Sequence, residues 1–160
     1  MTKHTTHLIT LLTALAIGAL APTTPAYAKG AKQPYALVPA GTAKFTPLDP
    51  RAPAGPQVAV ISGDLKAGPV ALLLKLPRGA EPIHWHTSDY YAVLVEGTAK
   101  HWLAGQVVPA QGSPAGTSWF QPGGSAATAH GDECTSDSCT VFVYMANGLD
   151  FTPVAPPASK

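Results

Sequence analysis

The stretch LPRGAEPIHWHTSDYYAVLVEG, residues 76–97, decides the fold. His84 and His86 stand two residues apart in a segment that we expect to be a β-strand. Because alternate strand residues point to one face, both imidazoles can converge on a single point, while Trp85 faces the other way. Two imidazoles at this spacing form half of a metal site. The alternative is a pair of solvent-exposed strand histidines, since this short pattern is also a common accident.

Outward from this stretch, the chain is divided into short apolar runs by turn residues. Each break contains Gly, Pro, Asp or Ser, as the boundaries of strands do. After residue 28, no segment has an amphipathic helical period that is free of proline and glycine. Short, evenly spaced strands predict an all-β sandwich or barrel. The expected strands cover residues 58–62, 70–76, 83–86, 90–95, 98–103, 118–121 and 140–146.

The first 28 residues have the three parts of a secretory signal peptide. Lys3 gives a weakly positive start, an uncharged apolar run covers residues 8–21, and Ala26-Tyr27-Ala28 is a small-x-small cleavage site. The apolar run is shorter than the roughly 20 residues that a membrane-spanning helix needs. We therefore expect cleavage after Ala28 and a secreted or periplasmic protein that has no membrane segment after cleavage.

The remaining chain is expected to form one domain. Residues 29–56 are rich in Pro, Ala and Gly and predict an extended N-terminal arm; residues 57–152 hold the strands, and residues 153–160 predict a frayed tail. Without Lys3, nine basic residues remain of the ten, against nine acidic ones. This balance, with no cluster of Lys or Arg, excludes nucleic acid as a partner.

Cys134 and Cys139 are the only cysteines. In a chain bound for an oxidising compartment, they predict a disulfide. Two free thiols are the alternative, and so is a two-cysteine metal site, for which a lone pair is a weak signal.

Two motifs together resemble those of the cupin family. Residues 76–97 match the first motif, which has a glycine, His-x-His, a carboxylate a few residues on and a strand that ends in a glycine turn. GTSWFQPGG, residues 116–124, followed by His130, matches the second. The resemblance implies a small cupin-type β-barrel, a double-stranded β-helix or jelly roll, over residues 57–152. It also implies that His130 completes a metal site with His84 and His86.

The sequence departs from the cupin pattern at several positions. Tyr90 stands where glutamate is usual, with Asp89 beside it, and His130 comes three residues late. The segment Thr-Ser-Asp-Tyr-Tyr after the histidines and the later His-x-x-x-Cys resemble the ChrR-like cupins, which are largely uncharacterised. Asp89 and Tyr90 are therefore the candidate catalytic residues, Asp89 as a fourth ligand and Tyr90 as a hydrogen-bond donor. Their alternatives are a turn-capping residue and a core residue.

Three neutral imidazoles suit one divalent metal ion, with zinc as the first choice and Fe, Mn, Ni or Cu as alternatives. Such a set leaves a coordination position open for water or ligand. His101, on the strand after Gly97, is a possible neighbour that steadies a ligand; a partly exposed strand residue is the alternative.

Two functions remain open from the sequence. The first is an exported, metal-dependent enzyme of the oxygenase, isomerase or lyase type that acts on a small organic molecule. The second is a non-catalytic metal- or ligand-binding sensor, because ChrR-like cupins include such a regulatory domain. A homodimer is expected as a possible assembly, since cupins frequently pair through barrel strands.

Overall fold

The structure is a computed structural model that describes residues 34–155. The predicted signal peptide, the first residues of the arm and the last residues of the tail lie outside this range. Within it, short strands and one 3₁₀ turn supply the regular structure, and there is no α-helix among the described residues. The elements are β1 Thr46–Pro47, β2 Gln57–Gly63, β3 Val70–Ala80, β4 His84–Trp85, β5 Tyr90–Glu96, β6 Thr98–Leu103, β7 Ser113–Pro114, β8 Ser118–Gln121, η1 Ala126–Thr128, β9 His130–Met145 and β10 Thr152–Pro153.

The central part of the quoted stretch forms β5 because its side chains alternate between two environments. Tyr90, Ala92 and Leu94 are buried, whereas the outward-facing Tyr91 and Val93 are exposed. This period of two is the pattern of a strand with one face on a core. Gly97, at a φ of 90°, then ends the strand. An added Cβ there would lie 2.5 Å from the carbonyl oxygen of Ser138, so the turn needs glycine.

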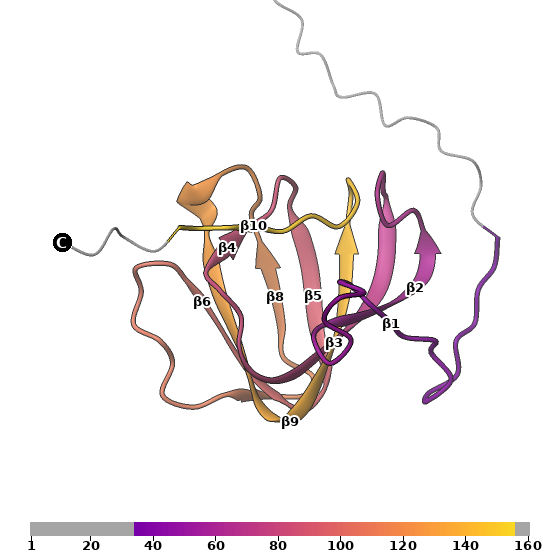
Figure 1. Ribbon diagram of the computed structural model, residues 1–160, viewed down its shortest axis with the longest axis horizontal. Coiled ribbons are helices and arrows are strands. Elements are labelled where there is room, and N and C mark those ends of the chain that lie inside the picture. The colour runs from indigo at the N-terminus through magenta and orange to yellow at the C-terminus, as the bar shows by residue number, and fades with distance from the viewer. Residues whose placement is uncertain (1–33, 156–160) are drawn as a thin grey trace, which may run out of the picture. The chain divides into compact units, whose positions relative to one another are not determined.

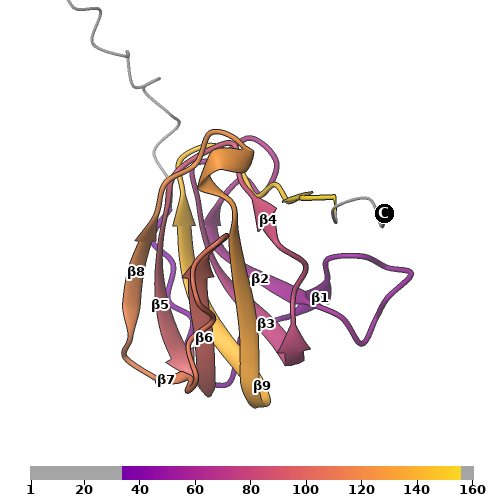
Figure 2. The same ribbon diagram turned by 90° about the vertical axis from the view of Figure 1, so that its left-hand side faces the viewer.

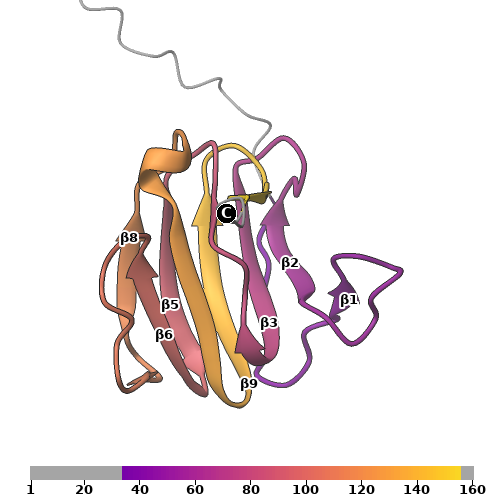
Figure 3. The ribbon, with the colours of Figure 1, turned by 60° about the vertical axis from the view of Figure 1, so that its left-hand side comes forward.

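The strands form one curled antiparallel sheet that wraps around the core (Figures 1 and 2). β9 lies at the centre of the topology, because it pairs with β3, β4, β5 and β6. β8 joins the outer side of β5, and β2 joins the outer side of β3. Figure 3 shows these strands side by side around the barrel. The predicted all-β fold is therefore confirmed.

β9 has two halves that differ in chemistry. The first half, His130–Cys134, pairs with β6, and the second, Thr140–Met145, pairs with β5 and β3. Its register against β3 shifts between the two halves, where a disulfide joins Cys134 to Cys139. Figure 1 shows β9 bending at the lower end of the barrel. The predicted disulfide is thus present, and it spans the bend.

The core fills the space inside the curled sheet. Its members come from β2, β3, β5 and β9, and they are Val58, Val70, Leu72, Leu76, Tyr90, Ala92, Leu94, Cys134, Cys139, Val141, Val143 and Met145. Among the described residues, no helix is long and apolar enough to cross a membrane.

Three predicted boundaries need correction. A strand was expected only from residue 140, but β9 begins at His130, because the polar residues 130–138 give no apolar alternation. β3 extends past the predicted residue 76 to Ala80, since it follows β9 through the bend. The tail was predicted to begin at Pro153, yet Thr152–Pro153 forms β10, which pairs with β4.

Candidate metal centre

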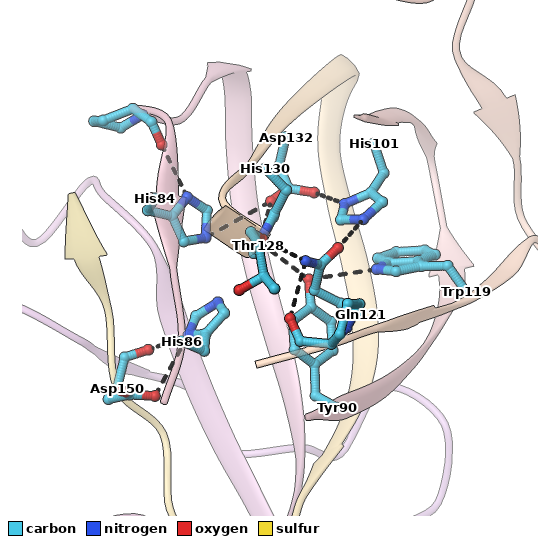
Figure 4. Close-up of polar contacts among 12 residues, drawn as sticks. His84, His86, Tyr90, His101, Trp119, Gln121, Thr128, His130, Asp132 and Asp150 are labelled. Carbon is cyan, nitrogen blue, oxygen red and sulfur yellow. Dashed lines mark hydrogen bonds and ion pairs between the residues drawn. The ribbon is translucent and has the colours of Figure 1, made fainter. Parts of the chain in front are cut away.

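The structure brings together the three histidines that were predicted as metal ligands. His84 lies on β4 and pairs directly with His130, the first residue of β9, while His86 follows β4. All three are buried, and each offers a ligand nitrogen within 4.8 Å of the others. Figure 4 shows their imidazoles turned toward one another from neighbouring strands. This convergence is what a shared metal ion requires.

Backbone carbonyl groups orient the rings of His84 and His86. His84 Nδ1 lies 2.8 Å from the carbonyl oxygen of Pro82, and His86 Nδ1 is hydrogen-bonded to the carbonyl oxygen of Asp150. A carbonyl oxygen only accepts, so Nδ1 carries the proton in both rings. The Nε2 atoms of the neutral rings are then free to bind a metal, an arrangement typical of histidine ligands.

His130 has a different environment, formed by side chains. Its Nε2 lies 3.2 Å from the hydroxyl oxygen of Tyr90, which in turn accepts a hydrogen bond of 3.4 Å from Nε1 of Trp119. The Tyr90 hydroxyl therefore donates to His130. The other nitrogen of His130, Nδ1, is buried without a hydrogen-bond partner.

Burial favours the neutral form of His130 and His84. It lowers the pKa of His130 to about 4, against the opposing effect of the Asp132 charge. It also lowers the pKa of His84, although the hydrogen bond to Pro82 and the charge of Asp132 oppose the shift. For Tyr90, burial first and then the charge of Asp132 raise the pKa, so the hydroxyl keeps its proton. Neutral imidazoles are the form that metal ions bind.

Asp132 is a carboxylate beside the histidines that the sequence analysis did not identify. Its Oδ2 lies 3.6 Å from Nε2 of His130 and 3.8 Å from Nε2 of His84. Its Oδ1 accepts a hydrogen bond of 2.7 Å from Nδ1 of His101. Burial raises the pKa of Asp132, but this hydrogen bond and the electrostatic attraction of His101, with smaller contributions from His130 and His84, outweigh it and lower the pKa. The spacing His130-Gly-Asp132 was the available signal, because it places both side chains on one strand face.

His101 lies at the edge of the site, where it holds Asp132. Its second nitrogen, Nε2, is 3.1 Å from Oε1 of Gln121, and its ring stacks on Trp119 at 5.0 Å between centroids. Gln121 is itself fixed, because its amide donates to the carbonyl oxygen of Thr128 at 2.7 Å. His101 thus lies beside the site and is hydrogen-bonded to Asp132.

Asp89 does not join this group. Its side chain is exposed, and Oδ1 accepts a hydrogen bond of 2.8 Å from the backbone nitrogen of Gly123. Gly123 packs so closely on Ser88 that an added Cβ would lie 2.2 Å from its carbonyl carbon. Asp89 therefore fastens the loop after β8 to the loop before β5, and the structure gives no support for it as a ligand or proton carrier.

A cavity of about 100 Å³ adjoins His84, His86 and Tyr90. Apolar side chains form most of its wall: Leu48, Pro56, Leu74, Leu76, Trp119, Val141, Val143, Met145, Leu149 and Phe151. Three acidic residues, Glu81, Asp132 and Asp150, also line it. Burial, with the charge of Asp132, raises the pKa of Glu81. Drug-sized ligands occupy about 300–1,000 Å³, so this cavity suits a smaller molecule.

The segment after β9 covers one side of the site. The ring of Phe151 stacks on His84 at 4.1 Å between centroids, and the carboxylate of Asp150 accepts a 2.8 Å hydrogen bond from the backbone nitrogen of Thr87. β10 and the hydrogen bond from Leu149 to the carbonyl oxygen of Leu65 fix both ends of this segment. This role could not be predicted from the sequence, because the segment contains no recognisable motif.

The residues fit a divalent metal ion. Three buried imidazoles converge, and two of them have the carbonyl partners that orient metal-binding histidines. Imidazole suits zinc, iron, nickel and copper, so the donor set does not select one of them.

Comparisons with known proteins find similarity only at the level of the fold. No protein-family model and no curated protein matches the chain. Among solved structures, an RmlC-like cupin from Shewanella frigidimarina NCIMB 400 matches with a TM-score of 0.52 and 16% identity, over 71% of this chain and 93% of that one. An RmlC-like cupin from Ralstonia eutropha JMP134 matches with a TM-score of 0.51 and 18% identity, over 74% and 76%.

A third similar structure is an enzyme. The DMSP lyase DddQ from Ruegeria pomeroyi DSS-3 matches with a TM-score of 0.50 and 16% identity, over 74% of this chain. The match spans 64% of that protein, which is less than two thirds of its length. At these identities the likeness shows the fold, which is the predicted cupin jelly roll. The ChrR-like subgroup stays a prediction.

Proposed function

We propose that the protein binds one divalent metal ion on His84, His86 and His130 and catalyses a reaction of a small organic molecule at this site. The observation that carries the proposal is the convergence of three buried histidines beside a small, largely apolar cavity. A metal ion bound there would act as a Lewis acid on a substrate oxygen. An oxygenase, an isomerase or a lyase is compatible with this chemistry.

Tyr90 is the proposed catalytic side chain for proton handling. It lines the cavity, and its hydroxyl oxygen lies 3.2 Å from Nε2 of His130. Because its pKa is raised, the hydroxyl keeps its proton and is a hydrogen-bond donor at neutral pH. Trp119 fixes the position of the hydroxyl oxygen. The apolar wall would exclude water from around a bound substrate.

Turnover by the metal-loaded protein tests this proposal. The protein is incubated with a panel of small carbonyl and carboxylate compounds, and oxygen uptake and product formation are followed. DMSP is included because one structure with this fold is a DMSP lyase. We expect turnover of at least one compound, its loss with a chelator, and a fall of about 10²–10⁴-fold in Tyr90→Phe with its metal retained.

A sensor is the competing function. Tight binding of a panel compound to the metal-loaded protein without any turnover would identify a sensor and contradict the enzyme. Equal turnover by Tyr90→Phe and the original protein would remove Tyr90 from the mechanism but leave the metal site intact.

We also propose that the protein is exported. The disulfide between Cys134 and Cys139 supports an oxidising compartment, and residues 1–28 have the pattern of a signal peptide. N-terminal sequencing of the protein from the outer cell fraction should start at Lys29. A protein that retains Met1 in the cytoplasm would contradict the proposal.

A further inference from the structure

We propose that Asp132 is a fourth ligand of the metal centre and that His101 is the residue that positions it. This inference rests on the proposed metal site. It assigns a role to a carboxylate from β9 in a chain whose first motif has tyrosine at the usual glutamate position.

The distances around Asp132 carry the inference. Its Oδ2 lies 3.6 Å from Nε2 of His130 and 3.8 Å from Nε2 of His84. Ligand atoms that each lie about 2.1 Å from one ion are about 3.0–3.6 Å apart at angles of 90–120°. The oxygen is therefore close to the spacing of a co-ligand of both histidines.

The two oxygens of Asp132 have separate partners. Oδ1 is fixed by His101, whose ring is held between Gln121 and Trp119. Oδ2 faces the two ligand histidines. A carboxylate held through one oxygen, with the other presented to a group of imidazoles, is the usual arrangement of a hydrogen-bonded metal ligand.

The neighbouring residue Gly131 lets Asp132 face the site. A Cβ at Gly131 would lie 2.3 Å from the ring of Trp102, so a larger residue would displace either the indole or the strand. With Trp102 packed on this side of β9, His130 and Asp132 both lie on the opposite side, where Asp132 lines the cavity. The sequence His-Gly-Asp is therefore matched to its place in the barrel.

Tyr90 is a weaker candidate for the fourth position. Its oxygen belongs to a neutral phenol and already accepts a hydrogen bond from Trp119. Asp132 offers a full negative charge, and one of its oxygens lies within 3.8 Å of Nε2 of both His130 and His84. An anionic oxygen ligand also partly neutralises a divalent ion in a buried site.

Cobalt substitution tests the inference, because the visible absorption of Co²⁺ reports its ligand set. Metal-free protein is titrated with Co²⁺, and Zn²⁺ affinity is measured by competition with a chelator. In Asp132→Asn, which keeps an acceptor for His101, we expect altered Co²⁺ bands and a Zn²⁺ Kd raised at least about tenfold. Glu133→Gln is the matched control: this adjacent carboxylate on β9 pairs with Lys100 at 2.9 Å, and its loss should change neither quantity.

His101→Gln separates positioning from ligation. The carboxylate remains and loses its anchor, so we expect a smaller rise in Kd with the original Co²⁺ band positions. Thermal unfolding of each metal-free variant checks that the barrel is intact. Original Co²⁺ bands and affinity in Asp132→Asn would overturn the inference and leave the three-histidine site standing. Absence of Co²⁺ binding by the unsubstituted protein would instead overturn the proposed function.

Discussion

The two halves of β9 perform different tasks with the same backbone geometry. In the first half, His130 and Asp132 face the inside of the barrel and form part of the candidate metal centre. In the second half, Val141, Val143 and Met145 face the same interior and form the core. Inward positions are even-numbered before the bend and odd-numbered after it, so the bulge at the disulfide changes the phase of the strand. Mutations in the second half should therefore affect mainly stability, and mutations in the first half should affect mainly metal binding.

The largest effect on stability is expected from the core half. Met145→Ala removes a fully buried side chain and should lower the free energy of unfolding by about 2–5 kcal/mol. Denaturant unfolding of the metal-free protein measures it. The metal content of the folded variant should not change, because all three histidines remain. Loss of metal at conditions where the variant is folded would show that the two halves are not separable.

Low pH should destabilise the protein through the first half of β9, which carries His130 and Asp132. The pKa of His130 is about 4 in the folded protein and near 6.5 in an unfolded chain, so the unfolded state binds more protons between these values. The stability of the metal-free protein should fall as the pH falls from 6.5 to 4, by about 3 kcal/mol from His130 alone. The lowered pKa of Asp132 continues the loss at more acidic pH.

Denaturant midpoints at a series of pH values measure this dependence. His130→Gln serves as the comparison, because it removes the titrating ring and keeps a polar side chain. The slope between pH 6.5 and 4 should be smaller in this variant. An equal slope in both proteins would assign the acid sensitivity to other groups.

The disulfide lies between the two halves. Replacing both cysteines in Cys134→Ser/Cys139→Ser releases a short loop and should cost about 2 kcal/mol of stability. Thermal unfolding with and without reductant measures the cost, and reductant should affect only the unsubstituted protein. The Zn²⁺ affinity should change little, since the ligands lie on other strands or before the bend. A collapse of metal affinity would mean that the bend sets the position of His130.

The smallest effect on stability is expected from a substitution outside β9. Asp89→Asn weakens the hydrogen bond to Gly123 at the surface and should cost about 1 kcal/mol or less. Turnover and metal content should stay as in the unsubstituted protein. A large fall in turnover with normal stability would restore Asp89 as a catalytic residue.

The difference between the two halves of β9 also explains which features could be predicted from the sequence. β5 and the second half of β9 were predictable because apolar side chains alternate along them. The convergence of His84 and His86 followed from strand geometry, and that of His130 from the resemblance of the second motif. The first half of β9 was missed because His130-Gly-Asp-Glu-Cys134 is polar, and its strand is set by pairing with β6.

The rest of the site depends on contacts between distant segments. Asp132 reaches the histidines only because β9 lies between β6 and β4. Phe151 covers His84 because β10 pairs with β4, which joins residues far apart in the chain. Asp89 was chosen as a candidate because it follows the two histidines closely in the sequence, and Asp132 was not considered. The hydrogen bond to Gly123 shows that it turns to the neighbouring loop.

The central claim is that His84, His86 and His130 bind a metal ion. Elemental analysis of the purified protein beside His84→Ala and His130→Ala tests it most directly, with Glu133→Gln as a control that removes an outward carboxylate. The account predicts about one divalent ion per chain in the unsubstituted protein and the control, and close to none in the two histidine variants. Equal metal content in all four proteins, whether near zero or near one, would contradict it.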